Sequence, residues 1–137
     1  MSKVIRSAEV DIEVPFHDVD AMEVVWHGHY VKYLEIARCE LLRTFNYDYP
    51  QMAESGYIWP IVDMRLKYVD SALFGQVIEV QANLVEYENR LKIEYLVRNK
   101  GTDKVLTKAY TVQVAVCMKS REMQFESPAI VRENLGV

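Results

Sequence analysis

The sequence predicts an α+β fold in which one long helix packs against an antiparallel sheet. Apolar residues recur at helical spacing between about residues 27 and 45, and later segments alternate apolar with polar residues. Short polar connections join these later segments, as is typical of antiparallel hairpins. One helix layer on one sheet layer gives an α+β domain.

Length and composition favour a single domain over residues 1–137. Half of the 137 residues are hydrophobic, with only 5 Gly and 4 Pro, and domains of this size are common. The first residues lack the apolar run of a signal peptide, and no stretch approaches the roughly 18 apolar residues of a membrane span. We therefore expect a cytoplasmic protein. The net charge of −4 argues against general nucleic-acid binding, which favours broad basic surfaces.

The first elements are a strand, a loop and the long helix. Val4–Val14 alternates apolar with acidic residues in its second half, and Pro15 ends this strand. A loop rich in acidic residues continues to about His27, and the helix then extends to about Phe45. The stripe of apolar positions that predicts it consists of Tyr30, Leu34, Ala37, Leu41 and Phe45. So wide an apolar face is typical of a helix enclosed by other structure.

Strands dominate the rest of the chain, after a connection from Asn46 to Gly56. A last short helix is expected after Pro128, as Ala129–Leu135. Some apolar side chains occupy the other face of the strands, which suggests that the chain associates with another copy; they include Leu96, Ala109, Ala115 and Cys117. The expected strands are Ile61–Val69, Val77–Val85, Leu91–Arg98 and Leu106–Met118.

The segment Phe16–Tyr30, FHDVDAMEVVWHGHY, is the candidate for chemistry. It contains all three histidines of the chain and three acidic residues: His17, His27, His29, Asp18, Asp20 and Glu23. Acidic residues are common in loops before a helix, where the helix dipole favours them. Histidine has the side-chain pKa nearest neutrality, so its concentration here indicates a functional site.

This segment and its continuation Tyr33-Leu34-Glu35-x-Ala37-Arg38 resemble the signature of the 4-hydroxybenzoyl-CoA thioesterase family, in particular its small bacterial acyl-CoA thioesterases. Trp59-Pro60-Ile61-Val62 and Phe74-Gly75-Gln76 fall where the family begins its second strand and turns before the next. The resemblance implies a hot-dog fold, a long central helix wrapped by a five- or six-stranded antiparallel sheet. It also implies a homodimer that forms the active site, commonly assembled into a homotetramer, with no cofactor.

The resemblance assigns roles by position. Asp20, rather than Asp18, matches the acidic catalytic residue, which either attacks the thioester carbonyl or deprotonates water. His27 matches a position near the thioester, where it would position water, bond to Asp20 or protonate the leaving thiolate. One departure is Glu23, where the family often has Gly; it either shares in catalysis or is a solvated turn residue, and we favour the latter.

The resemblance also implies the groups that bind the substrate. A backbone N–H near Ile58 and Trp59 would stabilise the developing oxyanion. Arg90 and Lys92 would meet the phosphates of coenzyme A. They belong to residues 90–108, which hold six basic and two acidic residues, a balance of +4.

Three alternatives stay open. His27-Gly28-His29 with the nearby acids would form a metal-dependent hydrolase, although residues at i and i+2 diverge at a helix start. A non-catalytic module would bind acyl-CoA or an acyl-carrier protein without turnover. An acyl-carrier-protein thioesterase would hydrolyse the same bond on a protein-borne substrate. The acyl group itself is not indicated by the sequence.

Overall fold

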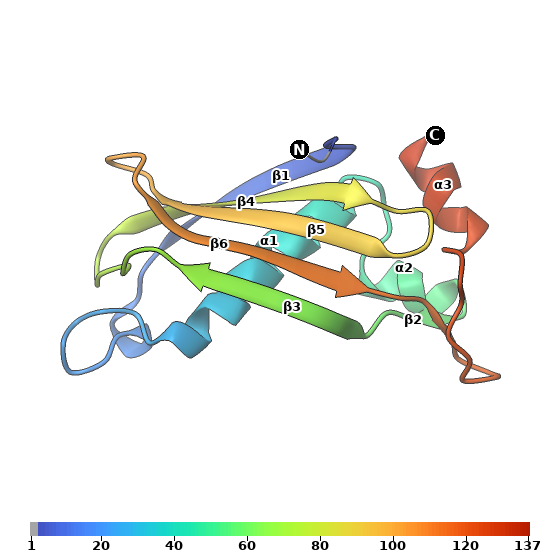
Figure 1. Cartoon of the computed structure of the whole chain (residues 1–137), viewed down its shortest axis with the longest axis horizontal. Helices are drawn as coiled ribbons and strands as arrows, with labels where there is room; N and C mark the ends of the chain where they lie inside the picture. Colours follow the sequence, from blue (N-terminus) through green and yellow to red (C-terminus); the bar gives the residue numbers. More distant parts are fainter. Residues whose placement is uncertain (1–2) are drawn as a thin grey trace.

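The computed structural model describes residues 3–137, and its main feature is one antiparallel sheet (Figure 1). Five strands lie in the order β1-β4-β5-β6-β3, and every neighbouring pair is antiparallel. The edges of the sheet are therefore β1 and β3. The strands are β1 (Arg6–Glu13), β3 (Ile61–Tyr68), β4 (Val77–Glu86), β5 (Leu91–Asn99) and β6 (Val105–Gln113).

The long helix α1 (Tyr30–Arg43) crosses one face of the sheet and packs against β1 and β4 (Figure 1). A single 3₁₀ turn, His27–His29, precedes it. Leu34, Ala37 and Leu41 are fully buried against the alternate strand residues that face them. Burying each leucine removes its apolar surface from water, which contributes roughly 1.5–3 kcal/mol per side chain. The predicted fold class, a central helix wrapped by an antiparallel sheet, is confirmed.

Two details differ from the sequence prediction. The connection from residue 46 to 56 contains a short helix, α2 (Tyr49–Glu54), which begins with a capping box between Asp48 and Gln51. The predicted strand Leu106–Met118 is two strands, because β6 ends at Gln113 and β7 (Val116–Cys117) pairs with β2 (Tyr57–Ile58) in a separate two-stranded sheet. The last helix, α3 (Ala129–Leu135), has the predicted bounds.

The apolar residues that suggested a second copy have different environments. Ala115 is buried in this chain, and Ala109 packs against its core. Leu96 alternates with the buried Tyr95 and Val97, and so lies on the face away from α1. Among residues 3–137, no helix is long and apolar enough to cross a membrane.

Candidate active site

Asp20 lies in a tight turn between β1 and α1. Its main-chain N–H donates to the Val24 carbonyl at 3.0 Å, and its own carbonyl accepts from the Glu23 N–H at 2.9 Å. Its Oδ1 accepts from the Met22 N–H at 2.8 Å, a local bond that aspartates commonly form in turns. The side chain is exposed. The turn therefore fixes the carboxylate at the surface, where a ligand can reach it.

Glu23 occupies the one position of this turn that needs an unusual backbone. Its φ is 62°, in the left-handed region that costs a residue with a Cβ about 1–2 kcal/mol. This requirement explains physically why glycine suits the position in the resembling family. The Glu23 side chain is exposed, and its carbonyl accepts from the Phe74 N–H at 3.1 Å.

The start of the helical segment brings His27 beside Trp26. The two rings lie 5.2 Å apart between centroids. Gly28 permits this arrangement, because a Cβ there would come within 2.2 Å of the Trp26 ring. The N–H groups of His27 and Gly28 donate to no acceptor within residues 3–137. The positive end of the helix dipole and two N–H groups are therefore available at this point.

A cleft of about 410 Å³ opens between the Asp20 turn, the start of α1 and the end of β3. Its volume lies within the range of small-molecule sites. The structure thus brings the two predicted catalytic residues, Asp20 and His27, to one cleft. The side chains that line it include Asp20, Trp26, His27, Tyr30, Tyr68 and Asp70.

Tyr68, at the end of the edge strand β3, also lines this cleft. Its hydroxyl donates to the His27 carbonyl at 3.0 Å. Its ring meets those of His27 and Tyr30 edge-on, at 6.0 and 5.3 Å between centroids. Tyr30 is buried, and its hydroxyl accepts from the Ala72 N–H at 3.0 Å. Tyr68 therefore braces the main chain at His27, and Tyr30 ties the start of α1 to the segment after β3.

Asp70 is the second carboxylate of the cleft. It forms an ion pair with Lys104 at 2.5 Å and accepts from the Ser71 N–H at 2.8 Å. The hydrogen bond from Lys104 holds the pKa of Asp70 below its usual range, so it stays ionised. No Lys or Arg lines the cleft within residues 3–137.

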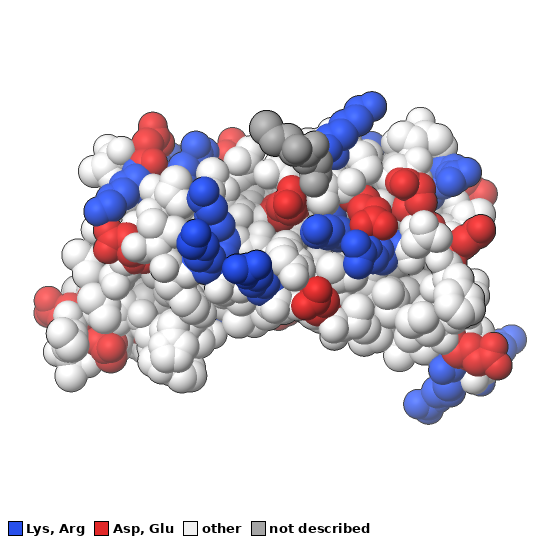
Figure 2. Space-filling view, in the orientation of Figure 1, with Lys and Arg blue, Asp and Glu red and all other residues white. Residues whose placement is uncertain are grey.

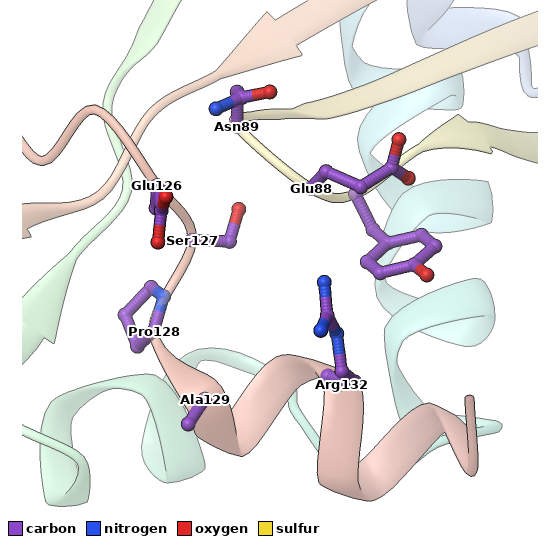
Figure 3. Close-up of a pocket in the computed structure, with 8 residues that line it drawn as sticks. Glu88, Asn89, Glu126, Ser127, Pro128, Ala129 and Arg132 are labelled. Atoms are coloured by element: carbon purple, nitrogen blue, oxygen red, sulfur yellow. The ribbon is translucent and has the colours of Figure 1, made fainter.

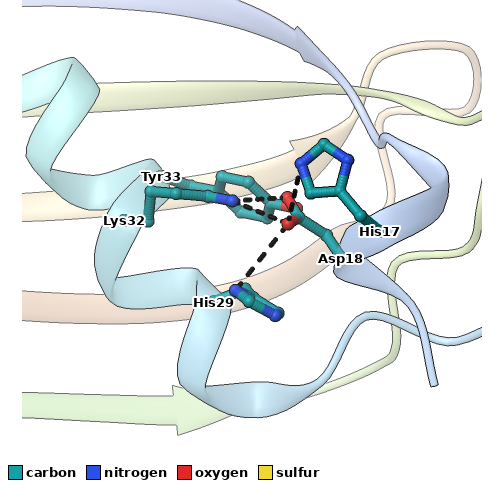
Figure 4. A network of polar contacts seen from close by, with 5 residues as sticks. All are labelled: His17, Asp18, His29, Lys32 and Tyr33. Atoms are coloured by element: carbon teal, nitrogen blue, oxygen red, sulfur yellow. Dashed lines mark hydrogen bonds and ion pairs between the residues drawn. The ribbon is translucent and has the colours of Figure 1, made fainter.

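Asp18 does not line the cleft but anchors it (Figure 4). It is 1% exposed, and Lys32 Nζ donates to both of its carboxylate oxygens at 2.7 Å. The Tyr33 hydroxyl donates to Oδ2 at 2.6 Å. His17 Nε2 and His29 Nδ1 lie 3.6 and 3.8 Å from Oδ1. The loop is thereby attached to the first turn of α1.

These contacts keep the Asp18 carboxylate charged. Burial alone would raise its pKa, but the hydrogen bonds from Lys32 and Tyr33 and the charge of Lys32 lower it below the ordinary value. Burial, and then the same contact with Asp18, raise the pKa of Tyr33. Within residues 3–137, no three His, Cys, Asp or Glu side chains form a group that could hold a metal ion.

Ile58 and Trp59 lie far from the cleft of their own chain. They precede β3, whereas Tyr68 ends it, and eight strand residues span roughly 26 Å. Trp59 is buried, and its indole N–H donates to the Tyr47 hydroxyl at 3.1 Å. One protomer therefore does not bring this predicted oxyanion site to Asp20.

Arg90 and Lys92 also lie at the end of the sheet away from the cleft. Arg90 is in the turn before β5, and its guanidinium pairs with Glu86 at 2.9 Å. The Lys92 ammonium lies over the Tyr110 ring, 5.0 Å from its centroid.

A second cavity of about 410 Å³ lies near Arg90, between the β4–β5 turn and α3 (Figure 3). The guanidinium of Arg132 points into it over the Tyr87 ring, 5.9 Å from the centroid. Glu88 and Glu126 also line it, so acidic side chains outnumber basic ones. No residue of the predicted catalytic pair lines this cavity.

The fold and the acidic loop that opens onto the central helix define a hot-dog protein with one candidate active site. The Thioesterase-like superfamily matches residues 14–135, and the chain belongs to this family.

Relatives and solved structures agree with this assignment. A putative esterase of Synechocystis sp. is 27% identical over 128 residues, covering 93% of this chain and 77% of the relative. Acyl-CoA thioesterase YbgC of Haemophilus influenzae is 29% identical over 102 residues, covering 69% of this chain and 75% of the relative. The structure of a 1,4-dihydroxy-2-naphthoyl-CoA thioesterase from Synechocystis has a TM-score of 0.84 at 16% identity, covering 95% of this chain and 96% of that one. That last similarity establishes the fold alone.

Proposed function

We propose that the protein hydrolyses acyl-CoA thioesters to the free acid and coenzyme A, with Asp20 and His27 as catalytic residues. The observation that carries this proposal is their presence in one cleft at the start of α1, in a member of the thioesterase-like superfamily. Relatives named acyl-CoA thioesterases support the substrate class.

Two routes fit the position of Asp20. The carboxylate attacks the thioester carbonyl, expels the CoA thiolate and forms a mixed anhydride, which water then cleaves. Alternatively, it takes a proton from the water that attacks the carbonyl. Label in the Asp20 carboxylate after a single turnover in ¹⁸O-water identifies the first route, because it arises only when water attacks the Asp20 carbonyl of the anhydride. In both routes we assign to His27 the protonation of the leaving thiolate.

The developing oxyanion has two candidate binding groups. The free N–H groups of His27 and Gly28 are in the same chain as Asp20. The N–H groups near Ile58 and Trp59 would reach Asp20 only from a second copy. The edge strand β3 is free to pair with its copy, and antiparallel pairing would bring the start of one β3 to the end of the other.

The proposed homodimer therefore completes the site, and it would also bring Arg90 and Lys92 of the partner subunit to the cleft's end of the sheet. Mixing Asp20→Asn chains with Trp59→Pro chains tests this arrangement. Proline removes the N–H but also the buried ring of Trp59, so the variant is used once its circular dichroism matches wild type. Activity should then reappear only in mixed dimers. Assembly of dimers into a tetramer and a cytoplasmic location stay predictions, tested by light scattering and by cell fractionation.

The charge of the cleft limits the acyl group. Asp20 and Asp70 both line it. Lys104 pairs with Asp70, so Asp20 carries the uncompensated negative charge. We infer that neutral acyl groups are accepted and that acyl groups carrying a carboxylate are repelled.

The deciding experiment is a panel of acyl-CoAs and acyl-carrier-protein thioesters, assayed by release of free thiol. Turnover of neutral acyl-CoAs supports the proposal. Turnover of carrier-bound thioesters alone identifies a carrier-protein thioesterase instead. Binding without turnover of any thioester identifies a non-catalytic module and overturns the proposal.

A further inference from the structure

Three basic side chains on the outer face of the sheet, the face away from α1, lack a counter-ion. Lys67 of β3 lies directly opposite Lys108 of β6, and Arg65 lies two residues before Lys67 on the same face. None of the three forms an ion pair within 4.0 Å of any residue in the range 3–137. We call Arg65, Lys67 and Lys108 the outer basic cluster.

Basic residues on the neighbouring strands and turns are engaged. Lys92 lies over the ring of Tyr110. Four others have a carboxylate partner; these pairs are Arg90 with Glu86, Arg98 with Glu79, Lys100 with Asp11, and Lys104 with Asp70. The outer basic cluster is therefore a local excess of positive charge beside four basic residues that each have a carboxylate partner.

The arrangement within the cluster is unfavourable without a ligand. Like charges that face each other across an antiparallel pair destabilise the sheet. A pair of opposite charges occupies one such facing position between β4 and β5, where Arg98 faces Glu79. A sheet position that holds two lysines face to face, with an arginine beside them, gains stability when an anion binds between them.

The cluster also has the shape of a small site. A shallow cavity of about 310 Å³ is lined by Arg65, Lys67, Lys108, Tyr110 and Glu94. Three cations against one carboxylate leave a local charge of +2. Figure 2 shows this face of the molecule, with Lys and Arg atoms gathered over the middle of the sheet.

We propose that the outer basic cluster binds a phosphate-bearing anion with two or more negative charges, such as a diphosphate. Such a group is compact enough to contact all three cations and neutralise them together. The Arg65 fork can donate to two phosphate oxygens, and each lysine ammonium adds a charge-assisted bond. Because Lys67 and Tyr68 are neighbours on a strand, they point to opposite faces, so this site is separate from the catalytic cleft.

Thermal unfolding with inorganic pyrophosphate tests the proposal without catalysis. At low salt, millimolar pyrophosphate should raise Tm by a few degrees, whereas KCl of equal ionic strength should not. Lys108→Gln should raise Tm in the absence of pyrophosphate, because it removes the facing charges. It should also weaken pyrophosphate binding by about tenfold.

Lys119→Gln is the matched control, since Lys119 is exposed and does not line this cavity. It should leave the pyrophosphate effect unchanged. The proposal fails if pyrophosphate and KCl shift Tm equally, or if Lys108→Gln and Lys119→Gln behave alike.

Kinetics with acyl-CoA and with the matching acyl-pantetheine, which lacks the nucleotide phosphates, identify the source of the anion. A rise in KM of Lys108→Gln for acyl-CoA alone shows that the cluster binds the nucleotide end of the substrate. An unchanged KM, together with the pyrophosphate effect, shows that it binds a free phosphate compound. Absence of any turnover would contradict the proposed function and leave the unfolding result valid.

Discussion

Replacing Asp18 by Asn tests the anchor beneath the catalytic loop. The carboxylate is 1% exposed and accepts three short hydrogen bonds, two from Lys32 and one from Tyr33. Breaking a buried ion pair costs about 3–5 kcal/mol, but the Lys32 side chain is 46% exposed and can regain water. Asn also keeps one oxygen acceptor. We therefore expect the free energy of unfolding to fall by about 2–3 kcal/mol at pH 7.

The contribution of Asp18 to stability should depend on pH in a definite direction. The pKa of Asp18 is lower in the folded protein than its ordinary value. Its stabilisation is therefore complete above the unfolded pKa and is lost as the pH falls through the folded one. In urea unfolding, the difference in free energy of unfolding between wild type and Asp18→Asn should decrease from about pH 5 downward. Asp11→Asn on β1, whose side chain is exposed, should show a far smaller change. Equal stability at pH 7, or a gap independent of pH, would refute the reasoning.

Two further predictions concern the cleft. His27→Ala should lower kcat by about 10²–10⁴-fold. If His27 protonates the leaving thiolate, the loss of kcat should be smaller for thioesters of more acidic thiols. An equal loss of kcat on all thioesters would contradict that role. Tyr68→Phe removes the hydrogen bond to the His27 carbonyl, and a bond of about 0.5–1.5 kcal/mol corresponds to a two- to tenfold loss in kcat/KM. Unchanged kinetics of Tyr68→Phe would show that the hydroxyl does not position His27.

The helix and most strands follow from local pattern. Apolar spacings of three and four predicted α1 because one face of this helix is buried. Strict alternation predicted β4 and β5 because one face of each strand is buried. The pattern failed for Leu106–Met118, where a continuous apolar run hides the change of sheet after Gln113. The helix α2 was missed, although Asp48 and Gln51 form a capping box that the sequence displays.

The site was predictable only where its residues are close in sequence. Asp20 and His27 belong to one loop, and the structure places both in the cleft. Tyr68 ends β3 and Asp70 follows it, so both reach the same cleft because this edge strand lies beside β6. Residues 90–108 show that closeness in sequence can also mislead. Most of their basic side chains are paired or stacked in the structure. Lys108, which forms no ion pair within residues 3–137, instead lies beside Arg65 and Lys67 of the edge strand β3.

The most direct test of the central claim is the kcat/KM of Asp20→Asn on the best neutral acyl-CoA. Asn keeps the size of the side chain and an oxygen for the Met22 N–H, so the turn should persist and circular dichroism should match wild type. We predict a loss of about 10²–10⁴-fold, with Asp11→Asn at the wild-type level. Activity of Asp20→Asn comparable to wild type would contradict the assignment of Asp20 as the catalytic carboxylate.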